Sequence, residues 1–199
     1  MSSNSRRISF LKHTGDAPEA VSDTILLAAC AKGDVSALGT LFDRHHIALY
    51  RFITSLVSPN TADVDDILQN TFMAACKCAH RFSGRSTVQS WLFGIAINSV
   101  RRHRRQTAQH TRNLTALAHT PLKEVPSPHD ATESKQQVEQ LNHAITELPS
   151  KYREPFVLCE IEGLKGAEAA KILGLREGTL WRRLHTARKT LACALKRQS

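Results

Sequence analysis

GLKGAEAAKILGLREGTLWRRLHTARK, residues 163–189, decides the fold of the C-terminal part of the chain. In its second half, apolar residues recur at intervals of four, three and four, which marks one face of an α-helix: Leu180, Leu184, Ala187 and, just beyond, Leu191. The first half predicts a shorter helix that ends at Gly174, where a left-handed residue is needed. Two short helices joined by a tight turn predict a helix-turn-helix.

The outward face of the second of these helices is strongly cationic. No Asp or Glu follows Glu177, and the residues that point away from the apolar stripe include Trp181, Arg182, His185, Thr186 and Lys189. A second cationic run without acids, RRHRR at 101–105, also lies on a helical pattern. Such a face can simply be solvated, but in a helix-turn-helix the second helix presents it to the DNA major groove.

The composition points in the same direction. The chain has 199 residues and a formal net charge of +9, and the cationic excess lies in residues 1–110 and 141–199. A polyanion is therefore the expected partner. The five cysteines are odd in number and lie in apolar helical patterns, which disfavours a disulfide framework and fits a reducing cytoplasm. No signal peptide and no run of 18 apolar residues is visible, so no membrane insertion is expected.

The rest of the chain is also helical in its periodicity. Apolar residues follow the helical period in 23–30, 35–57, 62–82, 88–105 and again from 136, and no segment alternates with a period of two. Residues 107–135 lose the period and contain three prolines. The sequence predicts an all-α protein of two small helical domains joined by a flexible linker: a mobile tail (1–20), a first domain (21–108), the linker (109–135) and a second domain with the helix-turn-helix (136–199).

Apolar positions also predict which residues face inward. In 62–82 they are Ile67, Leu68, Phe72 and Cys76. In 23–30 they are Ile25, Leu26, Ala29 and Cys30, and in the first helix of the helix-turn-helix Ala167, Ala170, Ile172 and Leu173. Pro155 predicts that PFVLCEIEG, residues 155–163, starts a new helix or a kinked one.

Two stretches together resemble one known family. Residues 147–191, ELPSKYREPFVLCEIEGLKGAEAAKILGLREGTLWRRLHTARKTL, resemble the promoter-reading C-terminal domain of bacterial RNA polymerase sigma factors. DDILQNTF (65–72) and WLFGIAINSVRRHRR (91–105) are similar to the family's polymerase-binding and promoter-melting helices. The two matches occur in family order, and with only these two domains the chain resembles the extracytoplasmic-function class. The resemblance implies a protein that binds core RNA polymerase, directs it to promoters and is not an enzyme, with no cofactor or small-molecule substrate.

The resemblance also implies contacts to the polymerase. The family docks its first domain on the clamp helices of the polymerase's largest subunit, and the matching positions are Asp65, Asp66, Gln69 and Asn70. The acids can equally be ordinary first-turn acids, which the helix dipole favours. The apolar segment PFVL (155–158) packs either on the polymerase flap or in the core, with the core favoured. Members of this class are commonly held inactive by an anti-sigma factor, which is therefore an expected partner.

For the promoter −10 element, the family flips a base into a pocket made by a loop and the following helix. The matching residues are Phe82, Ser83, Arg85, Ser86 and Asn98. Phe82 and Asn98 suit stacking and hydrogen bonding to the base edge, which must offset a few kcal/mol of unstacking. The residues expected to hold phosphates are Arg101, Arg102, Arg104 and Arg105. Trp91 and Phe93 are either stacking platforms or core residues, with core packing favoured. Gly94 departs from the family, which often has a basic residue there.

For the promoter −35 element, the matching residues are Arg176, Thr179, Trp181, Arg182, Arg183, His185 and Thr186. Arg182 and Arg183 are the leading candidates for reading bases, because an arginine can bond guanine through two hydrogen bonds. Thr186 stands where many relatives carry Arg, and Trp181 where many carry Lys or Arg. Both departures indicate a promoter preference of its own.

Two other classes of function compete with this interpretation. A helix-turn-helix regulator that binds DNA alone explains residues 141–199 but leaves the acidic helix and RRHRR without a joint purpose. A metal protein would use CKCAH (76–80) or DRHH (43–46), but neither has a second ligand pair at useful spacing. No glycine-rich phosphate loop or nucleophile elbow is present. The sequence therefore predicts no metal and no catalytic residues.

Overall fold

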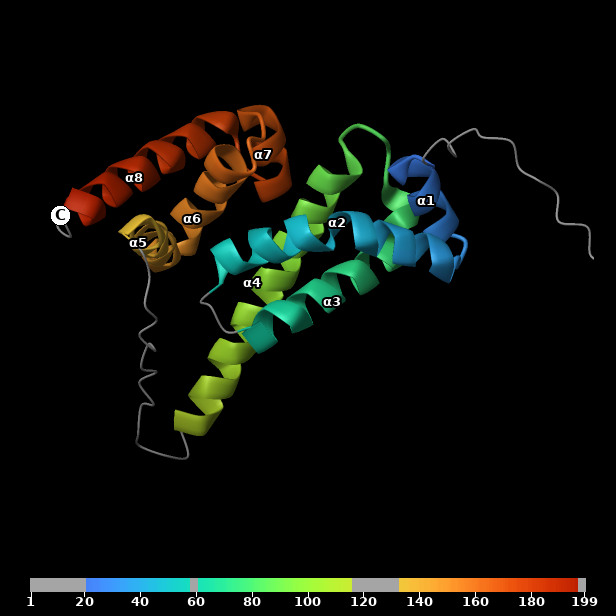
Figure 1. Cartoon of the computed structure of the whole chain (residues 1–199), viewed down its shortest axis with the longest axis horizontal. Helices are drawn as coiled ribbons and strands as arrows, with labels where there is room; N and C mark the ends of the chain where they lie inside the picture. Colours follow the sequence, from blue (N-terminus) through green and yellow to red (C-terminus); the bar gives the residue numbers. More distant parts are fainter. Residues whose placement is uncertain (1–20, 58–60, 116–132, 197–199) are drawn as a thin grey trace, which may run out of the picture.

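The structure, a computed structural model, describes residues 21–57, 61–115 and 133–196. All regular elements in these ranges are helical (Figure 1), which confirms the predicted all-α class. They are α1 (Asp23–Cys30), α2 (Val35–Leu56), α3 (Thr61–Cys78), α4 (Val88–Thr115), α5 (Glu133–Glu147), α6 (Ser150–Phe156), α7 (Gly166–Leu173) and α8 (Glu177–Lys196). A 3-10 turn spans Ala79–Arg81 and a π-helical turn spans Val157–Ile161.

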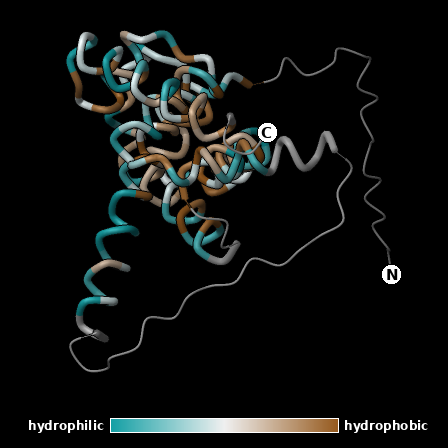
Figure 2. Tube along the Cα trace, turned by 90° about the vertical axis from the view of Figure 1, so that its left-hand side faces the viewer, coloured by the Kyte–Doolittle hydropathy of each residue, from teal (hydrophilic) through white to brown (hydrophobic). Residues whose placement is uncertain are grey.

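Helices α1 to α4 form the first bundle. Its core contains Phe52 and Phe93, whose ring centroids lie 4.4 Å apart, together with Ile67 and Ile97. Each such side chain stabilises the fold by about 1.5–3 kcal/mol through its removal from water. The C-terminal part of α4 leaves the bundle and is mostly hydrophilic, as Figure 2 shows.

The first bundle confirms most of the predicted inward residues. Ile67, Leu68 and Phe72 are buried, and Cys76 packs partly buried against the core. Ile25 was expected inward and is 61% exposed, whereas Leu27 is 2% exposed. In a helix as short and as uniformly apolar as α1, the sequence fits more than one face, and the packing against α2 decides which is buried.

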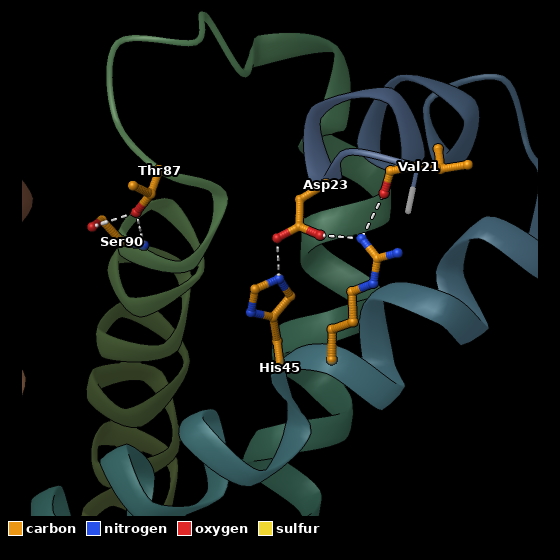
Figure 3. A network of polar contacts seen from close by, with 6 residues as sticks. Val21, Asp23, His45, Thr87 and Ser90 are labelled. Carbon is orange, nitrogen blue, oxygen red and sulfur yellow. Dashed lines mark hydrogen bonds and ion pairs between the residues drawn. The ribbon is translucent and has the colours of Figure 1, made fainter. Parts of the chain in front are cut away.

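A polar network ties α1 to α2 (Figure 3). The carboxylate of Asp23 accepts hydrogen bonds from Arg44 Nη1 and from His45 Nε2, each at 2.7 Å. Arg44 Nη1 also donates to the carbonyl oxygen of Val21 at 2.6 Å. Burial acts to raise the pKa of Asp23, but the hydrogen bonds and charges of Arg44 and His45 outweigh it and hold that pKa below its usual value. The ionised carboxylate therefore stabilises the fold.

Replacing Asp23 with asparagine is expected to lower the free energy of unfolding by about 1 kcal/mol at neutral pH, since the partly exposed charge pairs are lost. A lowered carboxyl pKa gives stability that is present above the unfolded-state pKa and is lost as the pH falls through the folded-state pKa. The difference between wild type and Asp23→Asn should therefore shrink in acid. Urea unfolding at pH 7 and at a pH well below 3.8, the ordinary pKa of the carboxyl, measures it, with the exposed Asp43→Asn as control. A difference that stays constant with pH would contradict this role.

Helix α4 ends later than the sequence indicated. Helix α4 continues to Thr115, so residues 109–115 of the predicted linker are helical. No proline or glycine interrupts the chain between Val100 and Thr115, so the helix continues through residues that are mostly polar. The predicted tail and residues 116–132 of the predicted linker lie outside the described residues.

Helices α5 to α8 form the second bundle. Pro155 does not start a new helix, because α6 begins at Ser150, contains this proline and passes directly into the π-helical turn. Pro155, Val157 and Leu158 are buried, so the PFVL segment packs in the core and leaves only Phe156 partly exposed.

The helix-turn-helix forms as the sequence predicts. Gly174 ends α7 in the left-handed conformation with φ of 67°, and the apolar stripe of α8 is buried at Leu180, Leu184, Ala187 and Leu191. One detail differs, because Ala169 is buried and the predicted Ala167 is exposed. Helix α7 packs on both α6 and α8, and this packing buries the face that carries Ala169 instead of the face that carries Ala167.

Candidate nucleic-acid and protein interfaces

The structure brings all five residues predicted for the −10 pocket together. Phe82, Ser83, Arg85, Ser86 and Asn98 line one pocket of about 330 Å³ between the 81–88 loop and α4. Gly84 turns this loop with φ of 70°. Thr87 begins the helix that follows: its Oγ1 accepts a hydrogen bond from the backbone N–H of Ser90 at 3.1 Å (Figure 3). Such a cap fixes the loop against α4.

The aromatic residues near this pocket divide into two roles. Phe93 is 1% exposed and belongs to the core, as favoured by the sequence. Trp91 is half-buried and lines the pocket, where its ring meets that of Phe82 edge-on at a centroid distance of 5.5 Å. The pocket thus has an aromatic wall beside the loop and an exposed amide at Asn98. Flat aromatic surface and an amide can stack on a base and bond its edge.

The pocket also has a wall that sequence reasoning missed. Glu168, Lys171 and Ile172 of α7 line it from the second bundle. Ile172 packs against Gly94 of α4, where a Cβ atom would lie 3.8 Å from Ile172 Cγ2. This contact joins residues 78 positions apart, so no local pattern in the sequence could have revealed it.

The four predicted phosphate-binding arginines do not lie together. Arg102 and Arg105 are exposed on α4. Arg101 and Arg104 turn toward the second bundle, where Arg101 Nη2 donates to Glu154 Oε2 at 2.6 Å and Arg104 Nη1 donates to Ser150 Oγ at 2.6 Å. Burial lowers the pKa of Arg104 from its ordinary value, and the nearby Glu154 partly offsets this. Two cations thus face solvent and two face the other domain.

The residues predicted for the −35 element lie along the outer side of the helix-turn-helix. Arg176, Trp181, Arg182 and His185 are exposed, while Thr179, Arg183 and Thr186 are partly buried. The Thr186 hydroxyl donates to the backbone carbonyl of Arg182 at 3.0 Å, so it is engaged within its own helix. Arg188, further along α8, forms an ion pair of 2.5 Å with Glu160. The arrangement leaves Arg182 as the most freely presented arginine of the recognition helix.

Gly166 positions Trp181, a relation that the sequence did not reveal. A Cβ atom on Gly166 would lie only 2.4 Å from Trp181 Cζ2, so the indole of α8 lies directly against the first residue of α7. Trp181 nevertheless keeps 48% of its surface exposed. The indole is thereby held across both helices with one part facing solvent. The only signal in the sequence was a glycine at the start of a predicted helix.

Gly166→Ala is expected to lower the free energy of unfolding by about 1 kcal/mol, because the clash outweighs the better helix propensity of alanine. The emission of Trp181, measured in a Trp91→Phe background, should also shift to the red as the indole moves into water. Gly178→Ala is the matched control, since its Cβ would meet open space, and it should leave stability and emission nearly unchanged. An unshifted emission in Gly166→Ala would refute the positioning role.

The candidate polymerase-binding residues lie on the exposed side of α3. Asp65, Asp66, Gln69 and Asn70 are all exposed. Asp65 and Gln69 border a groove of about 590 Å³ between α2 and α3, and Asn70 lies on the other side of the helix in a smaller hollow facing α4. The groove is largely apolar and contains exposed Val35, Phe42 and Met73. An exposed apolar groove with a polar rim is typical of a protein interface.

The two motifs weighed as metal ligands have other partners. In DRHH, His45 binds Asp23 and His46 Nδ1 lies 3.0 Å from the carbonyl oxygen of Phe42. In CKCAH, Cys78 Sγ donates to the carbonyl oxygen of Ala74. Within the part of the chain that the structure describes, no three His, Cys, Asp or Glu side chains gather as a metal site. The helices described there also include none with the length and apolar character needed to cross a membrane.

A helical bundle with a cationic helix end, followed by a helix-turn-helix, defines a DNA-binding protein of two all-α domains. Family comparisons agree: the model for sigma-70 region 2 matches residues 41–110, and that for sigma-70 region 4 matches residues 138–191. The ECF RNA polymerase sigma factor SigM of Mycobacterium tuberculosis is 35% identical over 172 residues, which cover 86% of this chain and 83% of SigM. The sigma factor CnrH of Cupriavidus metallidurans is 33% identical, covering 87% of this chain and 94% of CnrH.

Solved structures show the same likeness. The structure of CnrH in complex with the cytosolic domain of CnrY superposes with a TM-score of 0.64 at 29% identity, covering 89% of this chain and 99% of that one. The sigma factor RpoE of Bartonella quintana, solved in complex with the anti-sigma factor NepR, has the same fold, with a TM-score of 0.65 at 24% identity and 81% of this chain covered. The chain belongs to the extracytoplasmic-function (ECF) class of RNA polymerase sigma factors. It therefore directs RNA polymerase to promoters.

Proposed function

We propose that this sigma factor divides its work between its two bundles. The first, 21–108 with the helical extension to 115, binds core polymerase and opens the −10 element, and the second, 136–199, reads the −35 element. The observation that carries this proposal is the shared pocket of Phe82, Ser83, Arg85, Ser86 and Asn98, next to the cationic part of α4. A flipped base fits a pocket of this chemistry, and the protein takes part in no bond-making step of its own.

The groove between α2 and α3 is proposed as the surface for the clamp helices of the polymerase. Its apolar floor and its rim of Asp65 and Gln69 suit a helical partner with basic and apolar side chains. Asp66 and Asn70 would extend the contact around α3. The second bundle would meet the polymerase flap through its exposed surface. Because its proposed partners are promoter DNA and core polymerase, we also propose that the protein works in the cytoplasm.

An anti-sigma factor is the further partner that we infer. The solved structure of CnrH contains the cytosolic domain of CnrY, and CnrH is 29% identical to this chain in that comparison. An anti-sigma factor that covers the groove would exclude the polymerase, because the exposed Val35, Phe42 and Met73 can be buried by only one partner at a time.

The deciding experiment is a reconstitution of transcription. Purified protein and bacterial core polymerase transcribe a library of promoter fragments, and the transcripts are sequenced. We expect defined start sites only when the protein is present, with two spaced motifs upstream. A titration with core polymerase and with DNA alone then tests the rival role of a regulator that binds DNA unaided. Tight DNA binding by the free protein, without binding to core polymerase, would favour that rival.

A further inference from the structure

We propose that a hollow between α4 of the first bundle and α5 and α6 of the second is a binding site for a small molecule that carries a phosphate group. The hollow has a volume of about 580 Å³, which is ample for a small ligand. The inference goes beyond the proposed function, which assigns nothing to this hollow. Its walls combine two arginines, a histidine, an acid and several hydroxyl groups, among them Arg104, Arg153, His103, Asp63, Thr107 and Ser150.

Two guanidinium groups meet at one acceptor in the wall of this hollow. Arg104 Nη2 and Arg153 Nη1 both donate to the backbone carbonyl oxygen of Leu56, so the two cationic groups lie side by side. Like charges this close repel each other, and the repulsion is stronger in a partly buried place than in water. An anion beside the two groups would turn this repulsion into a shared attraction.

The surroundings of these two arginines disfavour their charge. Burial lowers the pKa of Arg104, and burial together with the charge of Arg104 lowers the pKa of Arg153 to about 10. Glu154 acts to raise both pKa values, but its carboxylate is bound through both oxygens by Arg101. A ligand anion in the hollow would therefore add compensation that the protein itself leaves incomplete.

Hydroxyl groups that can donate to an anion accompany the arginines. Ser150 Oγ accepts a hydrogen bond from Arg104 Nη1 at 2.6 Å, so its own O–H can donate to a ligand. Thr107 is exposed, and its Oγ1 makes only a long contact of 3.5 Å to His103 Nε2. The acid in the wall, Asp63, lies 3.5 Å from the same nitrogen of His103. Guanidinium and hydroxyl groups together form a donor set that suits phosphate oxygens.

The position of Arg153 favours a small ligand over a nucleic acid. Arg153 is only 9% exposed, and its guanidinium is held at the ends of α2 and α5 by hydrogen bonds to the carbonyls of Leu56 and Leu148. Only a group small enough to enter the hollow can reach it, whereas a DNA duplex would meet the exposed Arg105 on the surface of α4. Because Arg104 and Arg153 come from different bundles, a ligand that binds both of them bridges α4 and α6.

The test titrates inorganic pyrophosphate into the full chain at constant ionic strength. Isothermal titration calorimetry measures affinity and stoichiometry, and the midpoint of thermal unfolding is followed in parallel. Arg104→Gln removes one guanidinium of the pair, and Thr107→Val removes a hydroxyl while keeping the shape of the side chain. Arg105→Gln is the matched control, because it removes the same charge from the next position of α4, which does not line the hollow. Circular dichroism checks that each variant keeps its helical content.

We expect one pyrophosphate to bind per chain and to raise the midpoint of thermal unfolding as its concentration rises, because a ligand that binds only the folded state stabilises that state. Arg104→Gln should weaken binding about tenfold or more and Thr107→Val by a smaller factor, whereas Arg105→Gln should bind as wild type does. Binding that does not saturate, or an equal loss in Arg105→Gln, would show a general attraction of anions to a cationic chain and would overturn the site.

A DNA duplex separates the two sources of phosphate. A short duplex, at a matched concentration of phosphate groups, is added to protein that is saturated with pyrophosphate. Pyrophosphate that stays bound supports a site for small ligands, whereas its displacement would assign Arg104 to the DNA backbone and overturn the proposal. The reconstituted transcription assay judges the proposed promoter function separately, so a failure of this site and a failure of that function are distinguishable.

Discussion

Arg182→Ala is expected to reduce transcription from promoters with the matched −35 element by about 10- to 100-fold, with little change where that element is already mismatched. Arg182 is exposed in the first half of α8, the part of a recognition helix that meets base edges. An arginine that bonds guanine through two hydrogen bonds contributes about 1–3 kcal/mol of discrimination. Start-site counts over the promoter library measure matched and mismatched elements in one experiment.

The comparison for Arg182 is a pair of exposed cations in the other domain. Arg102→Ala and Arg105→Ala should weaken DNA engagement at all promoters alike and reduce its dependence on salt, because phosphate contacts carry no sequence information. If Arg182→Ala also lowered transcription equally at matched and mismatched promoters, its role in reading bases would be refuted. Arg182 would then be assigned to phosphate binding.

Local patterns in the sequence predicted the parts of the fold that depend on neighbours in the chain. The apolar period predicted the buried stripe of α8, and Gly174 predicted the end of α7 in a left-handed conformation. The five residues of the −10 pocket were named from the resemblance and lie together, because one loop and the first three turns of α4 carry them all. A helical period and a short loop fix these positions before any tertiary contact forms.

Contacts between distant segments could not be predicted in the same way. Arg153 and Glu154 are both buried, against the usual preference of charged residues for water, so no local pattern indicated that they lie inside. Each side chain is hydrogen-bonded to a distant part of the chain. Arg153 donates to the carbonyl of Leu56, 97 residues away, and Glu154 accepts from Arg101. The docking of the domains, and the α7 wall of the pocket with it, follows from these pairs rather than from any motif.

Arg153→Met is expected to lower the free energy of unfolding by about 3 kcal/mol, a larger stability effect than that of any other substitution considered for this chain. The guanidinium donates to the backbone carbonyls of Leu148 at 2.8 Å and Leu56 at 2.5 Å, and also to that of Thr146. These carbonyls end α5 and α2, where helices leave acceptors unsatisfied and carry partial negative charge. Removing the donor leaves the carbonyls of Thr146 and Leu148 without this partner, each at a cost of about 1–3 kcal/mol, whereas the Leu56 carbonyl keeps its hydrogen bond from Arg104.

The charge of Arg153 survives its burial. Desolvation, helped by the nearby Arg104, lowers the pKa of Arg153 to about 10, while Glu147 and Glu154 act to raise it, so the guanidinium stays protonated at neutral pH.

Arg153→Lys should recover part of the stability, because an ammonium keeps the charge but lacks the planar fork that reaches two helix ends. Arg188→Met is the control: that side chain is 55% exposed, and its pair with Glu160 should contribute less than about 1 kcal/mol. Urea unfolding followed by circular dichroism ranks the three variants by their free energy of unfolding. Equal losses of that free energy for Arg153→Met and Arg188→Met would contradict the assignment of Arg153 as the cap shared by α2 and α5.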